Sequence, residues 1–416
     1  MKKNEVLIPI IVVIVGLLCF GLSFVFKEKV NEVEKPGEKP SEKEEVLNYN
    51  TNLIKGVHTD YKGSNYLVSP YSIEIALNLL REGTNNSTLE ELNKALPNRE
   101  FKDLNSANVK ISNATFINKQ YESKVLKTFT DNMKNKYHAE EIIDQITPKL
   151  INDWANEKTD GMIKEVVDRI DDNFVYGVIN AVALDLKFKY QFECINTTET
   201  DFNKIDGSTM KVPMMHQTYE GNIKYVTNDE YQSVSLPYVS EGEYNYEIVG
   251  ILPKDIDSFI NGLTDEKLNN IMKDSKVASS DTNLALALPQ FSYEYKLEDN
   301  EFAKVLNILG IKEVFNKEKA DFSRFMSKED IEKIGNIYVS KAVHKTFIDL
   351  NEQGTRAAAV TYFGMDKNEM IIEQPKIVSI TFDKPFVYMI RETGTNEILF
   401  FGIVYEPKTW TGPTCQ

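Results

Sequence analysis

The segment that decides the fold is Asp349–Phe363, which reads DLNEQGTRAAAVTYF. It begins at the end of a strand-like run, Val343–Leu350, and Gly354 permits a sharp change of backbone direction. The residues after this glycine are mostly small or β-branched. Small side chains meet little steric resistance in a crowded sheet. The segment is therefore either a surface loop or a stretch that can enter a sheet as a strand.

Helical patterns lie early in the chain, and strand patterns dominate later. Apolar residues recur at helical spacing in Ser72–Leu80, Thr88–Leu96 and Leu150–Ile163. Thr88 followed by Glu91 predicts a capping box at the start of the second helix. Later runs rich in β-branched and aromatic residues predict strands at Tyr246–Leu252, Leu284–Leu288, Ile377–Phe382, Val387–Ile390 and Ile398–Tyr405. Helices followed by strands indicate an α+β fold.

The N-terminus carries an almost unbroken apolar run, Val6–Phe26, after Lys2 and Lys3. A run of about 20 apolar residues can span a bilayer as a helix, and the positive flank places its N-terminal end in the cytoplasm. We therefore predict a single-pass transmembrane helix that anchors the chain over residues 1–27, with the remainder on the extracellular face of the membrane. Two alternatives stay open: a cleaved signal peptide, which would make the protein secreted, and a lipoprotein anchored on Cys19.

Residues 28–46 are rich in charged residues and contain two prolines. Such a stretch buries too little apolar surface to fold, so we predict a disordered linker. A globular part at residues 47–407 and a tail at residues 408–416 follow. Length alone would favour two or three domains.

Composition narrows the possible functions. The chain has 63 Asp and Glu against 48 Lys and Arg, a net charge of -15, which disfavours nucleic acid as a partner. Three Cys cannot make a disulfide framework, and whether Cys194 and Cys415 pair is left open. The zinc, nucleophile-elbow, dinucleotide and phosphate-loop motifs are all missing, so we predict no metal, no cofactor and no enzyme activity.

Several motifs, in their order and spacing, resemble those of serpins, the serine protease inhibitor family. Two lie around the deciding segment: Glu352–Thr361 resembles the loop hinge of inhibitory members, and Ile380–Ile390 resembles the C-terminal signature. The other matches are Ser69–Ile73, Ile151–Trp154 with Thr159–Gly161, Val212–Met215, Ser235–Tyr238, Leu288–Phe291, Leu309–Gly310, Val339–Lys345, Phe401–Gly402 and Glu406–Pro407. The resemblance covers residues 47–407.

This resemblance implies one α+β domain with a large mixed β-sheet, surrounding helices and an exposed reactive-centre loop. It implies a monomer that inhibits a target protease of the serine type, or of the cysteine type, as a suicide substrate. The protease cleaves the loop, and the cut loop inserts into the main sheet, so that the protease stays bound as a covalent acyl-enzyme. The alternative within the family is a non-inhibitory serpin that acts as a binding or scaffolding protein.

The resemblance also assigns residues. The loop hinge comprises Glu352, Gly354, Thr355, Arg356, Ala357, Ala358, Ala359 and Thr361. Arg356 replaces the family's usual Glu, and alternation along a strand points it outward. The scissile bond falls at Asn368–Glu369, where Asn368 suits a legumain-type protease. Lys367 would instead suit a trypsin-like protease, and Met365, Tyr362 or Met370 would suit chymotrypsin- or elastase-like enzymes.

A buried polar cluster that gates the sheet is implied at Ser69, Ser72, Asn180 and His344. Buried groups of this kind are expected to hydrogen-bond one another, with His344 as a structural residue. The run after Asn180 departs from the family pattern. It has Leu184, Asp185, Leu186 and Phe188 where Phe, Lys, Gly and Trp are usual. This departure predicts altered packing at the top of the sheet.

Overall fold

The computed structural model describes residues 8–14, 42–61, 63–273, 275–277, 282–355 and 376–412. The chain divides into two compact units, and each unit is assembled from three separate chain segments. The first unit contains residues 1–56, 72–183 and 297–344, and the second contains residues 57–71, 184–296 and 345–416. The single-domain organisation stays a prediction. Helix α1 (Glu42–Tyr61) begins inside the stretch predicted as a linker.

The first unit is built on a sheet with the strand order β4-β3-β5-β1-β15. These strands are β4 (Glu140–Asp144), β3 (Val109–Asn118), β5 (Tyr176–Leu184), β1 (Ile8–Ile14) and β15 (Ile337–Asn351). The helices of this unit include α2 (Pro70–Gly83), α3 (Asn86–Ala95), α4 (Lys127–Tyr137), α5 (Pro148–Lys158), α8 (Asp299–Ile308) and α9 (Lys328–Ile334). Two short 3-10 helices, η1 (Lys119–Lys124) and η3 (Glu313–Phe315), lie between them in sequence.

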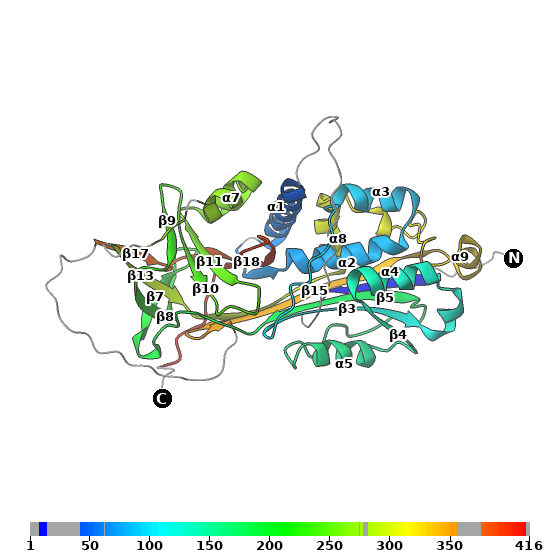
Figure 1. Cartoon of the computed structure of the whole chain (residues 1–416), viewed down its shortest axis with the longest axis horizontal. Helices are drawn as coiled ribbons and strands as arrows, with labels where there is room; N and C mark the ends of the chain where they lie inside the picture. The colour runs from blue at the N-terminus through cyan, green and yellow to red at the C-terminus, as the bar shows by residue number, and fades with distance from the viewer. Residues whose placement is uncertain are drawn as a thin grey trace, which may run out of the picture. The chain divides into compact units, whose positions relative to one another are not determined.

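Helix α5 lies on one face of this sheet, and α2 and α4 lie on the other (Figure 1). Pro148 at the first turn and Thr147, whose hydroxyl accepts the Leu150 amide, start α5. The helix then packs Trp154 edge-to-face against Phe116 of β3, with ring centroids 5.7 Å apart. The buried core between α5 and this sheet is formed largely by residues of α5 and of the strands on which it packs.

The predicted capping box is wrong. Helix α3 begins at Asn86, two residues before Thr88, so Thr88 already lies inside the helix. Glu91 instead accepts the backbone amides of Lys312 and Glu313, at 2.8 Å each. A carboxylate at the start of the distant 3-10 helix η3 satisfies two of its free amides, and this tertiary contact outweighs the local pattern.

The N-terminal apolar run is placed differently from the prediction. Its residues Ile8–Ile14 form β1, which pairs in parallel with both β5 and β15 and separates them in the sheet (Figure 1). Among the described helices, none is both long and apolar enough to span a bilayer. A short stretch of Ile and Val with one proline, Pro9, can form a parallel strand as well as part of a membrane helix, so sequence periodicity did not distinguish the two. The rest of the run, with Cys19, lies outside the described residues.

The second unit contains two further sheets. One sheet has the order β12-β9-β10-β11-β18-β19-β2 and the other β17-β13-β8-β7. The first is formed by β12 (Lys276–Val277), β9 (Lys224–Thr227), β10 (Tyr231–Pro237), β11 (Tyr246–Pro253), β18 (Phe386–Glu392), β19 (Ile398–Val404) and β2 (Tyr66–Val68). The second is formed by β17 (Lys376–Thr381), β13 (Thr282–Pro289), β8 (Thr209–Glu220) and β7 (Thr197–Asn203).

The rest of this unit consists of short strands and helices. Its further elements are β6 (Leu186–Lys187), β14 (Phe291–Glu298), β16 (Gly354–Thr355), η2 (Cys194–Asn196), α6 (Ile256–Asn261) and α7 (Asp265–Lys273). The five strands predicted from the later runs are all present, with bounds shifted by a few residues. The expected mixture of helices and several sheets, the α+β fold of a serpin, is confirmed.

Candidate functional site

The described part of the predicted loop hinge contains a short strand, β16, that begins two residues after the end of β15. The chain reverses at Glu352 and Gln353, where the Gln353 amide donates to Asn351 Oδ1 at 3.0 Å. Thr355 then pairs with Leu350 of β15 on one side and with Leu186 of β6 on the other. The first two residues beyond the turn therefore already form an antiparallel strand between β15 and β6.

Gly354 is required by the geometry of this turn. Its φ is +145°, a conformation that residues with a side chain rarely adopt. A Cβ atom at this position would lie 2.1 Å from the Leu186 carbonyl oxygen and 2.9 Å from the Lys187 Cα. The close approach of β6 thus excludes a side chain here.

Thr355 is buried, and the residues around it pack against the hinge. Its hydroxyl lies 2.7 Å from the Tyr238 hydroxyl. Burial raises the pKa of Tyr238 well above its usual value, so the phenol stays neutral. Tyr238 stacks on Phe188, with ring centroids 5.3 Å apart and planes within 1° of parallel. Phe188, one of the departures from the family pattern, is therefore a packed part of the hinge.

Glu352 anchors the hinge from a buried position. Its Oε1 accepts from Thr197 Oγ1 at 2.5 Å and from Gln290 Nε2 at 2.8 Å. Its carbonyl oxygen accepts the Phe192 amide at 2.9 Å. Because a buried carboxylate is costly unless it is hydrogen-bonded, these donors keep the end of β15 in place.

Sequence reasoning missed the partners of the hinge: Thr197, Gln290 and Tyr238. Gln290 and Tyr238 lie within motifs that carry the family resemblance, so the signal was present but assigned no role. Thr197 had no signal of its own.

The rest of the loop lies outside the described residues. This applies to Arg356, Ala357, Ala358, Ala359 and Thr361, and to Lys367, Asn368 and Glu369, together with the alternatives Tyr362, Met365 and Met370. Their assignments therefore stay predictions. The chain resumes in β17, which pairs in parallel with β13.

Part of the polar cluster is assembled in the first unit. Ser72 Oγ donates to Asn180 Oδ1 in a short hydrogen bond, and Asn180 Nδ2 donates to Asn113 Oδ1 at 2.8 Å. His344 is buried, with its ring 6.3 Å from that of Phe302. Ile14 of β1 pairs with both Asn180 and His344, so one strand lies between them. Ser69 is buried in the second unit.

His344 makes a testable contribution to pH-dependent stability. Burial lowers its pKa from 6.5 to about 3, so the folded protein keeps the ring neutral where an unfolded chain would protonate it. Stability therefore falls as pH drops from about 6.5 towards 3, by about 2 kcal/mol at pH 5. Urea unfolding at pH 7 and pH 5 measures this loss, which should be smaller in His344→Gln.

Burial also lowers the pKa of His216. Because His216 is present in the wild type and in His344→Gln, its contribution to the loss of stability is the same in both proteins and cancels when they are compared. An equal loss of stability in the wild type and in His344→Gln would contradict the assignment.

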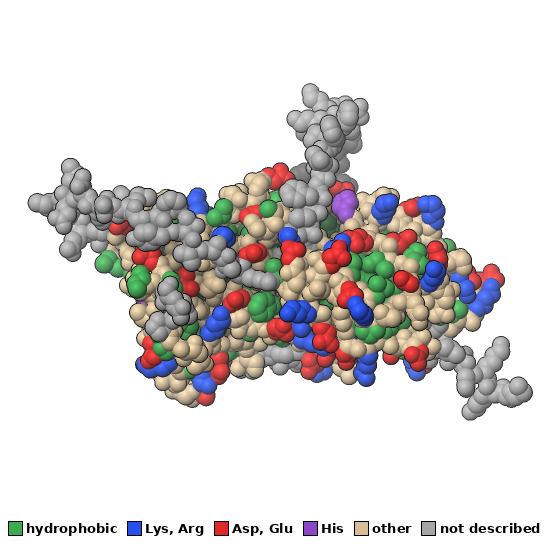
Figure 2. Space-filling model, turned by 90° about the horizontal axis from the view of Figure 1, so that it is seen from below, with side chains coloured by type: hydrophobic (Ala, Val, Ile, Leu, Met, Phe, Trp, Pro, Cys, Tyr) green, Lys and Arg blue, Asp and Glu red, His purple; other side chains and the backbone are tan. Residues whose placement is uncertain are grey.

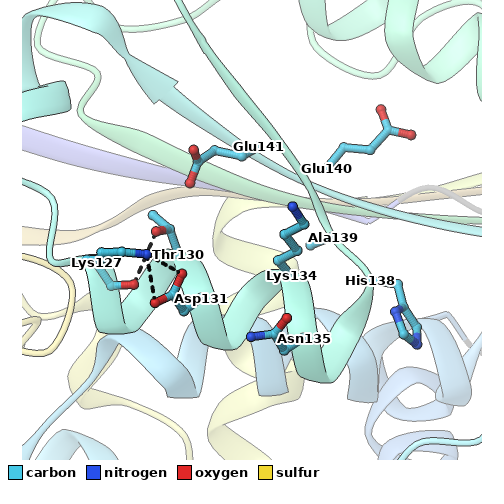
Figure 3. Close-up of a pocket in the computed structure, with 9 residues that line it drawn as sticks. All are labelled: Lys127, Thr130, Asp131, Lys134, Asn135, His138, Ala139, Glu140 and Glu141. Carbon is cyan, nitrogen blue, oxygen red and sulfur yellow. Dashed lines mark hydrogen bonds and ion pairs between the residues drawn. The ribbon is translucent and has the colours of Figure 1, made fainter.

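A surface hollow of about 850 Å³ lies between α4 and the start of β4 (Figure 3). Lys134 and Asn135 line it from the helix, and Glu140 and Glu141 line it from the strand. Within the described part of the chain, no three His, Cys, Asp or Glu side chains are grouped to hold a metal. None of the residues predicted from the sequence lines this hollow, and its charges of both signs favour no particular ligand.

The comparisons with known proteins agree with this geometry. The family model described as serpin (serine protease inhibitor) matches residues 45–407. The chain belongs to the serpin family. Serpins are generally protease inhibitors rather than enzymes.

Relatives of this serpin come from organisms that are distantly related to one another. An uncharacterized serpin-like protein of Thermococcus kodakarensis is 30% identical over 89% of this chain and 88% of its own. Neuroserpin of Homo sapiens is 28% identical over 88% of this chain and 92% of its own. The leukocyte elastase inhibitor of Xenopus laevis is 29% identical over 85% of this chain and 96% of its own.

Solved structures show the same fold. The thermophilic serpin tengpin in its native state matches with a TM-score of 0.73 and 27% identity, over 91% of this chain and 97% of that one. Thyroxine-binding globulin in complex with thyroxine matches with a TM-score of 0.72 at 22% identity, over 88% and 99% of the two chains. At that identity the second match supports the fold alone.

Proposed function

We propose that this serpin is an inhibitory member that acts outside the cell as a suicide substrate. One observation carries the proposal: β16 is paired on both of its edges, so the strand that the cut loop would extend has already begun. The family membership and the inhibitor among the relatives support it. The hinge is lined by Thr355, Tyr238 and Phe188 and has no bulky residue at Gly354, so the first part of the loop could enter beside β15 up to the positions that pair with β1.

The register of β16 supports a particular scissile bond. Thr355 pairs with Leu350, and each further loop residue would pair one residue earlier along β15. In this register Asn368 reaches Ile337, where β15 begins. A loop cut after Asn368 would therefore form a strand that reaches the start of β15, provided that β1 leaves Ile337–His344.

The chemistry follows from that cut. The nucleophile of the protease attacks the carbonyl carbon of Asn368, and the bond to the Glu369 nitrogen breaks as that nitrogen gains a proton. The acyl group stays on the protease while the loop inserts. The new strand hydrogen bonds, at about 0.5–1.5 kcal/mol each, would supply the free energy that distorts the protease.

Export is supported by Cys194, which is disulfide-bonded. Disulfides persist mainly in oxidising compartments. We do not propose the membrane anchor predicted over residues 1–27, because Ile8–Ile14 form a strand. Over the described residues of the face in Figure 2, acidic and basic side chains are interspersed. We therefore assign recognition of the protease to the loop rather than to a charged surface.

A gel tests this proposal. The protein is mixed with trypsin, chymotrypsin, elastase, subtilisin and a legumain, then boiled in detergent. We expect a covalent band at the summed mass of serpin and protease with at least one of these enzymes. Mass spectrometry of the released C-terminal peptide then distinguishes cleavage after Asn368 from cleavage after Lys367. Loop cleavage without a covalent band, and without a gain in thermal stability, would favour the non-inhibitory alternative.

A further inference from the structure

A short segment of the first unit, residues 166–171, lies between α5 and β5 in sequence and packs on the sheet. Asn152 of α5 holds its start, because the amides of Val166 and Val167 donate to Asn152 Oδ1 at 2.7 and 3.0 Å. Both valines are buried in one core cluster with residues of β5 and of β15. Since β1 lies between β5 and β15 in the sheet, the segment packs with strands on both sides of β1.

The same segment makes polar contacts with β15. Lys341 Nζ donates to Asp168 Oδ1 at 2.7 Å, and Ser340 Oγ donates to Asp171 Oδ2 in a long hydrogen bond of 3.5 Å. The side chain of Lys341 is only 11% exposed, whereas that of Asp168 is 61% exposed. The hydrogen bond from Lys341 lowers the pKa of Asp168 to about 2, so the carboxylate is charged near neutral pH. Loss of Asp168 would leave a mostly buried ammonium without this carboxylate.

Ser340 and Lys341 also form a bulge in the pairing of β15 with β1. The register shifts by one residue just before Lys341, so Ser340 lies opposite no residue of β1. Successive residues of a regular strand point to opposite faces, yet Ser340 and Lys341 both reach the segment 166–171. The extra residue of the bulge explains how these two neighbours can share one face.

An inserted reactive loop would fit this bulge less well than β1 does. The seven residues of β1 lie beside Ile337–His344, a stretch of β15 that is one residue longer because Ser340 is skipped. A loop that continues the register of β16 would pair with every position of that stretch in turn. Without the bulge, Ser340 and Lys341 would face opposite sides of the sheet and could not both reach the segment. The two contacts therefore favour β15 as it pairs with β1.

We propose that residues 166–171 form a latch that recognises the bulge at Ser340 and Lys341 and so retains β1 in the sheet. A contact shifts an equilibrium between two states only if it differs between them, and these contacts do. The latch makes β1 an autoinhibitory strand, because full insertion of a cut loop requires that β1 leave first. This last role rests on the function proposed above, whereas the retention of β1 does not.

Hydrogen exchange in the uncut full chain tests the latch without any protease. Asp168→Ala removes the acceptor of Lys341 and should accelerate amide exchange in Ile8–Ile14 about 10-fold. Asp171→Ala removes the longer contact and should give a smaller acceleration. Asp168→Glu keeps a carboxylate at this position, so its exchange should stay close to that of the wild type.

Asp153→Ala is the matched control. It removes an exposed ion pair to Lys149 on α5, in the same unit, and should leave exchange in Ile8–Ile14 unchanged. Strand β3 is not a neighbour of β1 in the sheet and should exchange at the wild-type rate in every variant.

Unchanged exchange in Ile8–Ile14 for Asp168→Ala would overturn the latch, even if the protein traps proteases. An equal acceleration in β3 would also overturn it, because Asp168 would then stabilise the whole unit rather than the position of β1. Failure to trap any protease would count against the proposed function and leave the exchange result standing.

Discussion

An arginine in place of Thr355 is expected to turn this serpin from a covalent trap into a substrate that its target protease cuts and releases. Thr355 is buried between Leu350 and Leu186, with its hydroxyl on Tyr238. A guanidinium at this position would have to be buried unpaired as the loop enters, or would hold β16 away from the sheet. A penalty of about 3 kcal/mol would slow insertion about 100-fold.

The measurement is the number of inhibitor molecules consumed per protease molecule trapped, together with the yield of covalent band. We expect that number to rise at least about 10-fold for Thr355→Arg, because hydrolysis of the acyl bond then outruns insertion. Thr355→Ser keeps a small side chain with a hydroxyl and should trap almost as the wild type does. An undiminished covalent band for Thr355→Arg would show that the hinge does not enter the sheet through β16.

The second large effect is expected from removal of residues 1–41. Strand β1 pairs with Ile337–His344 of β15, and the register of β16 would bring Thr361–Asn368 to these same positions. The two segments therefore compete for one slot between β5 and β15. With β1 in place, only Arg356–Val360 can insert before the loop meets Ile14.

Without residues 1–41, eight more loop residues can pair with β15 in the sheet. At about 0.5–1.5 kcal/mol for each, this adds about 4–12 kcal/mol to the cut form. We expect loop cleavage to raise the thermal midpoint of the shortened chain by about 10 °C more than that of the full chain. Differential scanning calorimetry before and after cleavage measures both gains.

The matched variant is Val12→Pro in the full chain. Val12 pairs with Ala342 and Val178, and proline removes a backbone donor from the middle of a strand. It should reproduce much of the effect of the deletion. Equal gains on cleavage for the full chain, the deletion and Val12→Pro would contradict competition for the slot.

The change of backbone direction at Gly354 was predictable from the sequence because its signal is local. Gly354 and the small residues after it occupy consecutive positions, and a turn followed by an insertable strand depends on those residue types. The supports of the hinge were not predictable in the same way. Thr197, Gln290 and Tyr238 are 155, 62 and 117 residues distant from their hinge partners. No local pattern connects groups so far apart.

The N-terminal run shows the opposite case, in which a strong local signal was compatible with two environments. Val6–Phe26 is an almost unbroken apolar run, and burial in a bilayer and burial in a sheet are both favourable for apolar side chains. What places Ile8–Ile14 in the sheet is the presence of two partner strands, β5 and β15, whose backbone groups pair with it. Hydropathy carries no information about those partners.

By itself the sequence determined the α+β class, the strand segments, the serpin family and the change of backbone direction at Gly354, because these follow from residue types along short stretches. Only the tertiary structure decided what holds the hinge and what fills the slot beside β15. It also decided that Glu91 caps a distant helix and that the tail reaches Gln290 and Asp349. These are contacts between segments far apart in the chain. Their hydrogen bonds form only once the fold has brought the partners within about 3 Å of one another.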